Sequence, residues 1–275
     1  MPTKTKVRNM FDSIAGDYDA LNHILSLDVD KIWRRKALKQ IVDAPAPVQV
    51  LDLACGTGDF SIAIAKALSR SHKRVGTPIE AHVKVPAKAP VEAQVTSTGF
   101  VTGDSGRSDL MTKGHVTGVD LSEGMLAVMR EKVGKAGLTE MISIEEGDGE
   151  NLRFPDNTFD RVTIAFGIRN FEDRPKGLRE MLRVLKPGGR LVILELSRPE
   201  NKVIRWFYDL YFLHILPKIG GKVSGDKAAY AYLPASVAAF PGKKAFMATM
   251  REAGFRTVTH KAFTLGICRM YTGEK

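Results

Sequence analysis

The chain has 275 residues, of which 44% are hydrophobic and 26% are charged, and its formal net charge is +10. This composition excludes a disordered or fibrous protein, and the length suffices to bury a full core in one domain, residues 1–275. A basic surface would attract nucleic acid or anionic lipid, but many proteins are basic only for solubility, so charge alone does not choose a partner.

Residues 1–44 open the chain, and we expect them to form a helical cap over the domain that follows. After the basic start MPTKTKVRNMF, the stretch FDSIAGDYDAL carries three Asp where a secretory signal would have its apolar region. The protein is therefore expected to be cytoplasmic. Two cysteines, Cys55 and Cys268, lie far apart and match no metal-ligand spacing, which predicts two reduced thiols and no metal site.

Strand-like runs alternate with helical patterns along the rest of the chain. The helical patterns include 122–133, where Ser122 is a candidate N-cap, and 175–189, where Gly188 should end the helix. Strands separated by helices predict an α/β fold with a mostly parallel, doubly wound sheet and helices on both faces. Only two residues join the last two strands, too few for a parallel crossover, so the last strand should be antiparallel. The seven predicted strands are 48–54, 115–121, 141–148, 159–167, 189–197, 255–263 and 266–273.

The turn after the first strand, DLACGTGDF at 52–60, carries the most chemistry. In a doubly wound sheet, ligands bind at the carboxyl ends of the strands, beside the switch point where this turn should lie. Gly56 and Gly58 would let a ligand approach the backbone, but a nicotinamide-binding turn has a third glycine where this chain has Ser61. Asp59, at the start of the helix, would repel a pyrophosphate and suits an ammonium or sulfonium group. The turn therefore favours S-adenosylmethionine (SAM) over a dinucleotide.

Acidic residues at the ends of three strands continue the predicted cofactor site. Asp52, near the end of the first strand, could take up the positive amino end of SAM or could cap the turn. Asp120 ends the second strand and opens a helix, which is the context of a residue that binds ribose. Asp148 and Gly149 end the third strand, where a carboxylate and a backbone N–H could bind the adenine ring.

Asp120 lies much farther from the glycine turn than the ~20 residues usual for a ribose-binding acid. We explain the difference by an insertion at residues 70–114, after the first helix, where a longer surface loop costs little. The segment is rich in Val, Ala, Pro, Lys, Thr and Ser and has no sustained helical period. Its basic residues could touch a membrane or a partner, or the segment could be a lineage-specific loop.

Several stretches together resemble one protein family. They are DYDALNHILSLDVDKIWRR (17–35), VLDLACGTGDF (50–60), GVDLSEGML (118–126), FPDNTFDRVTIAFGIRNF (154–171), LKPGGRLVILELSRP (185–199), YAYLPASVAAFPG (230–242) and the closing EAGFRTVTHKAFTLGICRMYTGEK. On these residues the chain resembles the menaquinone and ubiquinone biosynthesis C-methyltransferases, a family of class I SAM-dependent methyltransferases with a Rossmann-like sheet. The glycine turn is common to many methyltransferases, whereas FGIRN and FTLGI are more particular. The resemblance covers almost everything outside residues 70–114.

The resemblance implies methylation of a ring carbon on a polyprenylated quinol, with SAM as the methyl donor. Demethylmenaquinol is the first expected substrate, and a 2-polyprenyl-6-methoxy-1,4-benzoquinol of ubiquinone biosynthesis is the alternative. The SAM contacts of the family map onto Thr57, Asp120, Asp148 and Gly149. Ala165 stands where family members often have Ser, so no contact is assigned to it.

Arg169 and Asn170, just after the fourth strand, are the candidate catalytic residues. Deprotonation of a quinol hydroxyl would make the neighbouring ring carbon nucleophilic. We expect Arg169 to stabilise the phenolate or to orient a water that takes the proton, and Asn170 to hold the hydroxyl. Arg is itself a poor base because it stays protonated, and a structural ion pair is the alternative role for Arg169.

Residues 201–235 are expected to form a lid that accepts the isoprenoid tail of the substrate. Trp206 and Tyr211 are its candidate substrate contacts, and two more, Tyr18 and Asn22, lie in the N-terminal cap, where Tyr18 could instead only pack. The run 203–217 is too short and too charged to span a bilayer. It could lie at a membrane surface, or it could be an ordinary amphipathic helix packed on the sheet.

Two other classes of protein compete with this interpretation. A nicotinamide-dependent oxidoreductase would share the sheet and Asp120 but would need the missing third glycine. A nucleic-acid-binding protein would use the charge, yet the chain has no RNA-binding aromatic motif and its basic residues are scattered, so we expect no nucleic-acid partner. The sequence leaves open a peripheral contact with the inner face of the membrane and the formation of a homodimer.

Overall fold

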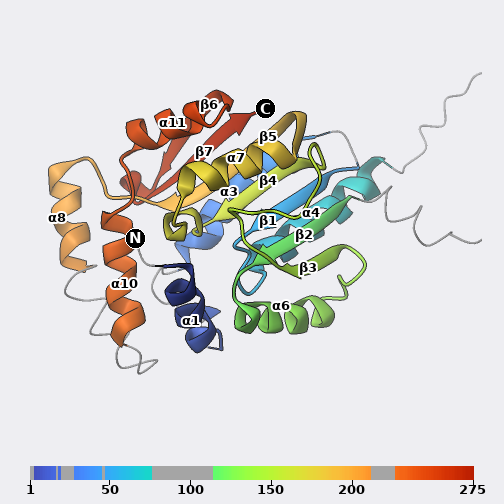
Figure 1. The fold of residues 1–275 in the computed structure, drawn as a ribbon, viewed down its shortest axis with the longest axis horizontal. Coiled ribbons are helices and arrows are strands. Elements are labelled where there is room, and N and C mark those ends of the chain that lie inside the picture. The colour runs from blue at the N-terminus through green and yellow to red at the C-terminus, as the bar shows by residue number, and fades with distance from the viewer. Residues whose placement is uncertain (1–2, 17, 20–27, 45–46, 76–113, 212–226) are drawn as a thin grey trace, which may run out of the picture.

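The computed structural model describes residues 3–16, 18–19, 28–44, 47–75, 114–211 and 227–275. Seven strands form one sheet in the order β3-β2-β1-β4-β5-β7-β6 (Figure 1). Their bounds are β1 Gln49–Leu53, β2 His115–Asp120, β3 Ile142–Glu146, β4 Phe159–Ala165, β5 Leu185–Leu196, β6 Arg256–Phe263 and β7 Cys268–Glu274.

Strands β1 to β5 pair in parallel, whereas β7 is antiparallel to both β5 and β6. The predicted doubly wound sheet with an antiparallel last strand is therefore confirmed. The chain runs from β1 outward through β2 to β3, then returns to place β4 on the other side of β1. This reversal puts the switch point between β1 and β4, next to the glycine turn.

The helices of the described ranges are named in chain order. They are α1 Lys4–Ile14, α3 Val29–Ile41, α4 Asp59–Val75, α6 Glu123–Lys135, α7 Arg174–Val184, α8 Lys202–Leu210, α10 Lys227–Ala238 and α11 Lys243–Glu252, with two 3-10 helices, η1 Ile168–Asn170 and η3 Thr264–Gly266. None of these helices is both long and apolar enough to cross a membrane. Figure 1 shows α1, α8 and α10 at the end of the molecule that faces the carboxyl ends of the parallel strands.

Hydrophobic side chains fill both faces of the sheet because successive residues of a strand point in opposite directions. In β1, Leu51 and Leu53 belong to a cluster with α7 and α11, and Val50 belongs to a second cluster with α3, α4 and α6. All three side chains are fully buried. Burial of both faces explains why the central strands read as nearly continuous apolar runs.

The end of α7 differs from the sequence-based prediction. The helix was expected to continue to Gly188, but it ends at Val184, and Leu185 has extended backbone angles and begins β5. Pro187 disfavours helical angles at Lys186, so the chain leaves the helix before it reaches the glycine. Gly188 still has a positive φ of 75°, but within β5, where the pairing with β4 shifts register.

The predicted insertion, residues 70–114, lies mostly outside the described residues. Its first part is helical, because α4 continues to Val75, and β2 begins directly after it at His115. Residues 76–113 are not described, so the insertion stays a prediction. The predicted lid at 201–235 also stays a prediction, because the structure describes α8 and α10 but not the middle part, 212–226.

Candidate active site

A pocket lies at the carboxyl ends of the first four strands of the sheet. The turn after β1 contributes Gly56, the end of β2 contributes Asp120, and the segment after β3 contributes Asp148 and Gly149. The end of β4 and the segment after it contribute Ala165, Phe166, Gly167, Asn170 and Phe171. The parallel strands thus bring residues from four distant parts of the chain to one edge, as the sequence predicted.

Helix α1 covers this pocket with one of its faces. Lys4, Val7, Arg8 and Phe11 line the pocket, and their spacing puts them on one side of the helix. Asp12 fastens α1 to the start of α6, since its Oδ1 accepts hydrogen bonds from Ser122 Oγ at 2.5 Å and Gly124 N at 3.1 Å. The predicted N-terminal cap therefore includes a helix over the pocket.

Asp120 joins the turn after β1 to the turn after β2. Its Oδ2 accepts from the Gly56 backbone N at 2.8 Å, and its Oδ1 accepts from the Ser122 backbone N at 2.9 Å. Burial raises the pKa of Asp120, and the backbone N–H groups of Ser122 and Gly56 act in the opposite direction. These bonds hold the carboxyl group in place at the pocket wall, where each oxygen keeps a further lone pair for a ligand hydroxyl.

Asp148 lies in a cluster of charged side chains in the pocket wall. Lys4 Nζ lies 2.6 Å from Asp148 Oδ2 and 2.9 Å from Glu150 Oε2. The other oxygen of Asp148 accepts from the Glu150 backbone N at 2.9 Å. Gly149 is tightly enclosed, because a Cβ atom there would lie 2.6 Å from the ring of Phe171.

The two glycines of the turn have different surroundings. Gly56 lines the pocket, has a φ of 57°, and lies close to Tyr18. Gly58 does not line the pocket. It has a φ of 84°, and a side chain there would overlap Met129 of α6. Gly58 therefore shapes the turn by allowing α6 to pack against it.

Asp52 and Thr57, two predicted SAM contacts, also lie outside the pocket wall. Asp52 is 1% exposed and accepts a hydrogen bond from Ser61 Oγ at 2.6 Å. Burial raises the pKa of Asp52 to about 7. Thr57 is 3% exposed and donates to Asp19 Oδ1 at 2.5 Å. The roles of Asp52 and Thr57 in SAM binding stay predictions, and in the structure both side chains bond to other residues of the protein.

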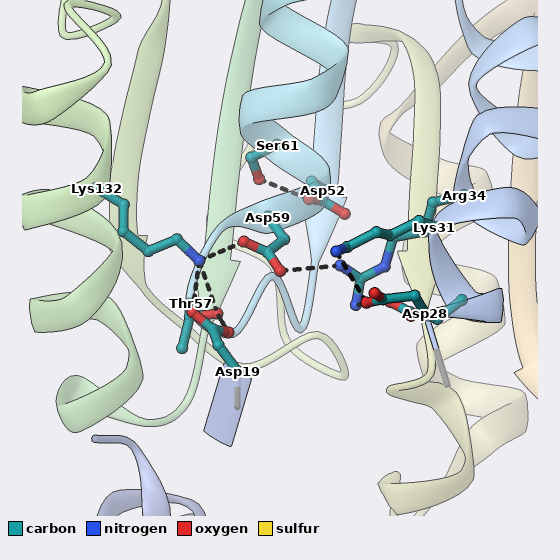
Figure 2. Close-up of polar contacts among 10 residues, drawn as sticks. Asp19, Asp28, Lys31, Arg34, Asp52, Thr57, Asp59, Ser61 and Lys132 are labelled. Atoms are coloured by element: carbon teal, nitrogen blue, oxygen red, sulfur yellow. Dashed lines mark hydrogen bonds and ion pairs between the residues drawn. The ribbon is translucent and has the colours of Figure 1, made fainter. Parts of the chain in front are cut away.

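Asp59 has basic partners of its own (Figure 2). Its carboxylate pairs with Lys132 of α6 and, at 3.2 Å, with Arg34 of α3. Lys132 also contacts Asp19 at 2.7 Å. That Asp59 suits an ammonium or sulfonium group of the ligand stays a prediction. The sequence did not reveal that side chains from α3 and α6 would pair with its carboxylate.

Arg169 and Asn170 are neighbours in η1, but their side chains lie in different environments. Asn170 lines the pocket, whereas Arg169 does not and is only 7% exposed. The Arg169 guanidinium lies 2.8 Å from the fully buried Glu195 and also donates to the carbonyl of Phe166. Burial acts to lower the pKa of Arg169, but Glu195 and nearby groups outweigh it, so the pKa is raised. This is the ion pair weighed as the alternative role of Arg169.

The predicted substrate contacts fall into three places. Tyr18 lines the pocket and packs edge-on against Phe11, with ring centroids 5.9 Å apart. Asn22 lies outside the described residues. Trp206 lies on α8 and is 61% exposed, and Tyr211, the residue that follows α8, is half-buried. Neither Trp206 nor Tyr211 is part of the pocket wall.

Sequence analysis missed several polar residues of this region, namely Lys4, Asp12, Glu150, Glu195 and Tyr232. Each acts through a partner far away in the chain, and no local motif marks any of them. Tyr232 of α10, for example, donates from its hydroxyl to Asn170 Oδ1 at 2.8 Å. A charged residue inside an apolar strand, such as Glu195 in LVILEL, was the one available signal, because such a residue needs a buried partner.

Comparison with known proteins identifies the family. The model of the ubiE/COQ5 methyltransferase family matches residues 2–275. This chain belongs to that family. A Geobacter sulfurreducens protein named ubiquinone/menaquinone biosynthesis C-methyltransferase UbiE is 43% identical over 270 residues, which cover 98% of this chain and 88% of that protein. A demethylmenaquinone methyltransferase of Bacteroides fragilis is 40% identical over 270 residues, covering 98% of this chain and 92% of that protein.

Solved structures share the fold of this ubiE/COQ5 family member at low sequence identity. A SAM-dependent methyltransferase from Aquifex aeolicus aligns with a TM-score of 0.51 and 20% identity, covering 87% of this chain and 88% of that one. The [4+2]-cyclase SpnF aligns with a TM-score of 0.64 and 15% identity, covering 100% of this chain and 96% of that one. Since the second structure is named as a cyclase, the shared fold alone does not determine the reaction.

The predictions of the family, of a methyltransferase enzyme and of SAM as its cofactor are confirmed. The alternative of a nicotinamide-dependent oxidoreductase is wrong. Within the described ranges, no group of three or more His, Cys, Asp or Glu side chains is arranged to hold a metal ion.

Proposed function

We propose that this protein methylates a ring carbon of a polyprenylated quinol, with demethylmenaquinol as the preferred substrate. The names of the relatives from Geobacter sulfurreducens and Bacteroides fragilis support this substrate class. One structural observation carries the proposal. A single pocket runs from the carboxylates of Asp120 and Asp148 to the amide of Asn170, which gives a cofactor and an acceptor adjacent sites.

The chemistry of the pocket wall fits SAM. Asp120 can accept hydrogen bonds from two ribose hydroxyls, and Asp148 with the backbone N–H of Gly149 can bind the edge of adenine. Gly56 adopts a positive φ that a side chain would strain, and its open face lets a ligand approach the turn. Val119 and Met125, which line the same wall, supply apolar surface for the adenine faces.

The acceptor end of the pocket supports methylation at carbon. Bound SAM supplies an electrophilic methyl group on a sulfonium. The residues of this chain must then place the ring and stabilise negative charge on its oxygen as the hydroxyl proton leaves. Asn170 has the position for this task because its amide borders the pocket, and exclusion of water by α1 would strengthen any hydrogen bond there.

Arg169 has an indirect role in this proposal, although the sequence made it a candidate for direct catalysis. Its contacts to Glu195 of β5 and to the carbonyl of Phe166, just after β4, hold η1 against these two strands. An Arg169→Ala variant would leave Glu195 buried without its partner, which costs about 3–5 kcal/mol of stability. A loss of activity in that variant is therefore not sufficient evidence for catalysis.

A comparison of Arg169→Ala with Glu195→Gln separates the two roles. Glu195→Gln keeps the guanidinium but weakens the ion pair. If Arg169 acts by positioning η1, both variants should lose methyl-transfer activity to a similar degree, measured at a temperature where both are folded. A loss at least tenfold larger in Arg169→Ala would instead support direct action of the guanidinium on the substrate.

The direct test of the function is a side-by-side assay. Purified protein is given SAM with demethylmenaquinol and, separately, with the demethylated ubiquinol precursor, and the methylated product is measured. We expect transfer to demethylmenaquinol, and a loss of roughly 10²–10³-fold in kcat for Asn170→Ala if the amide stabilises the ring oxygen. A protein that binds SAM but methylates neither quinol would contradict the proposed function.

A membrane-facing role for α8 is part of the proposal, because the substrate tail is lipid-soluble. Val203, Trp206, Phe207 and Leu210 follow each other at helical spacing and are 65%, 61%, 61% and 40% exposed. Lys202 and Arg205 flank them on the same helix. An exposed apolar stripe with basic neighbours is typical of helices that lie in the headgroup region of a bilayer.

Vesicle co-sedimentation tests this part of the proposal. A Trp206→Ser/Phe207→Ser variant should bind anionic vesicles more weakly than the wild type while keeping its activity on a short-chain quinol. Leu265→Ser is the matched control, because Leu265 is 72% exposed in η3 and outside the stripe. Equal sedimentation of the wild type, the stripe variant and the control would contradict a membrane role of α8.

A further inference from the structure

Helix α10 contacts the acceptor end of the pocket through two polar side chains one helical turn apart. Tyr232 donates from its hydroxyl to Asn170 Oδ1 at 2.8 Å, and Ser236 Oγ lies 3.3 Å from Arg169 Nε. Both partners belong to η1, a helix of three residues. A single face of α10 therefore holds both of the residues that the sequence proposed as catalytic.

The hydrogen bond from Tyr232 has a consequence for the Asn170 side chain. A primary amide presents an acceptor oxygen at one end and two N–H donors at the other. Since the Tyr232 hydroxyl engages the oxygen, the NH₂ end is the part of the amide that stays available to a ligand in the pocket. Burial raises the pKa of Tyr232, so its hydroxyl keeps the proton that this bond requires.

We propose that Tyr232 is a positioning residue that orients the Asn170 amide so that its NH₂ group donates to the ring oxygen of the methyl acceptor. The inference rests on the proposed function, because the ring oxygen is the atom that becomes negative there. An amide turned the other way would present oxygen lone pairs to that charge and repel it. Orientation of the amide thus decides whether Asn170 helps or opposes loss of the hydroxyl proton.

Local structure alone does not fix this orientation. The backbone N of Asn170 bonds to the Gly167 carbonyl at 3.0 Å, which positions the main chain but leaves the side-chain amide free to turn. Arg169 is held separately, by Glu195 and Ser236. Among the described residues, Tyr232 is the hydrogen-bond partner of the Asn170 side-chain amide. Removal of the Tyr232 hydroxyl should therefore affect this amide without disturbing the buried ion pair of Arg169 and Glu195.

A double-mutant cycle tests the inference. In Tyr232→Phe, kcat for methyl transfer to demethylmenaquinol should fall roughly 10- to 100-fold, which is a smaller fall than in Asn170→Ala, where the donor is removed. The Kd for SAM should stay within about twofold of the wild-type value. In an Asn170→Ala background, Tyr232→Phe should have no further effect on kcat, because the amide that it orients is gone. Tyr271→Phe is the matched control, since the Tyr271 hydroxyl is buried in the core and has no hydrogen-bond partner among the described residues.

Three outcomes would overturn the inference, two of them kinetic and one from NMR. The first kinetic outcome is a wild-type kcat in Tyr232→Phe. The second is a double variant whose fold-loss in kcat equals the product of the fold-losses of Tyr232→Phe and Asn170→Ala, because the two residues would then act independently. A wild type that methylates neither quinol would refute the proposed function instead. In that case the NMR signals of the Asn170 side-chain NH₂ still decide the matter. They should shift in Tyr232→Phe but not in Tyr271→Phe, and unchanged signals in Tyr232→Phe would overturn the inference.

Discussion

Asp52 illustrates how one buried carboxyl group can make stability depend on pH. Burial raises its pKa to about 7, against an ordinary value near 3.9 in the unfolded chain. Below about pH 4 the group is protonated in both states and has no effect on the difference between them. As pH rises from 4 to 7, the unfolded chain releases the proton while the folded chain retains it, so the folded state progressively loses stability. Above pH 7 this penalty is complete.

We therefore predict that Asp52→Asn is stabilising at neutral and alkaline pH. Asn cannot ionise, and its oxygen can still accept the hydrogen bond from Ser61. The advantage of the variant over the wild type should grow between pH 4 and 7, by roughly 2–4 kcal/mol, and then level off. Urea unfolding of the ligand-free proteins at pH 5 and pH 8 measures it. The exposed Glu252→Gln serves as control, and an equal Asp52→Asn effect at both pH values would contradict the prediction.

Gly58 shows that a motif residue can be required for packing rather than for ligand contact. We predict that Gly58→Ala lowers the free energy of unfolding by more than Gly188→Ala does. Both glycines have a positive φ, which strains an alanine by about 1–2 kcal/mol, but only at Gly58 would the new methyl group overlap a neighbour. The difference should be roughly 1–3 kcal/mol, typical of overpacking.

Chemical denaturation of the two alanine variants measures this difference, and Met129→Ala provides a check. If overlap with Met129 is the cause, Gly58→Ala should cost less in a Met129→Ala background, because the smaller side chain makes room for the methyl group. Equal costs of Gly58→Ala and Gly188→Ala would show that backbone strain alone accounts for both.

At the scale of the element, α1 depends on contacts at three points along its length. Lys4 reaches Asp148, Arg8 reaches Glu146 at 2.9 Å, and Asp12 bonds to the first residues of α6. The helix itself is short, and helices of this length are marginal in isolation. These contacts, together with burial of Val7, hold it over the pocket.

We predict that Asp12→Ala weakens SAM binding, because it removes the two hydrogen bonds that fix the end of α1. Loss of these hydrogen bonds costs about 1 kcal/mol, which corresponds to roughly a fivefold increase in the Kd for SAM. Titration calorimetry with SAM measures it. Ser13→Ala is the control, because its exposed hydroxyl bonds to the Met10 carbonyl within α1 itself. An unchanged Kd in Asp12→Ala would mean that α1 does not contribute to the cofactor site.

The elements differ in how far local sequence determines them. The β2–α6 connection was predicted closely, since Ser122 acts as N-cap by accepting from Met125 N at 3.1 Å. The end of α7 was misplaced because the preference of a residue before proline competed with a glycine stop signal, and the proline prevailed. This boundary therefore followed from a competition between two local signals, which the sequence analysis weighed wrongly.

At the scale of the whole molecule, the site depends on the order of the strands. The placement of β4 beside β1 brings residues 165–171 next to the glycine turn at 52–60, although the two segments are far apart in the sequence. The antiparallel β7 then extends the sheet beyond β5, and its Arg269 lies opposite Glu195 in the strand register. The strand that carries Glu195 thus pairs on one side with β4 and on the other with the last strand of the sequence.

The sequence by itself determined the fold class, the location of the site at the carboxyl ends of the parallel strands, the family and the cofactor. These follow from hydrophobic periodicity and from short motifs, which depend on residues that are neighbours in the chain. Only the tertiary structure decided which of the candidate side chains reach the pocket. Asp59 and Arg169 meet buried or half-buried partners from α3, α6 and β5, whereas Asn170 meets Tyr232 and the pocket. The availability of a charged or polar group is set by its nearest partners in space, and local sequence patterns do not record those partners.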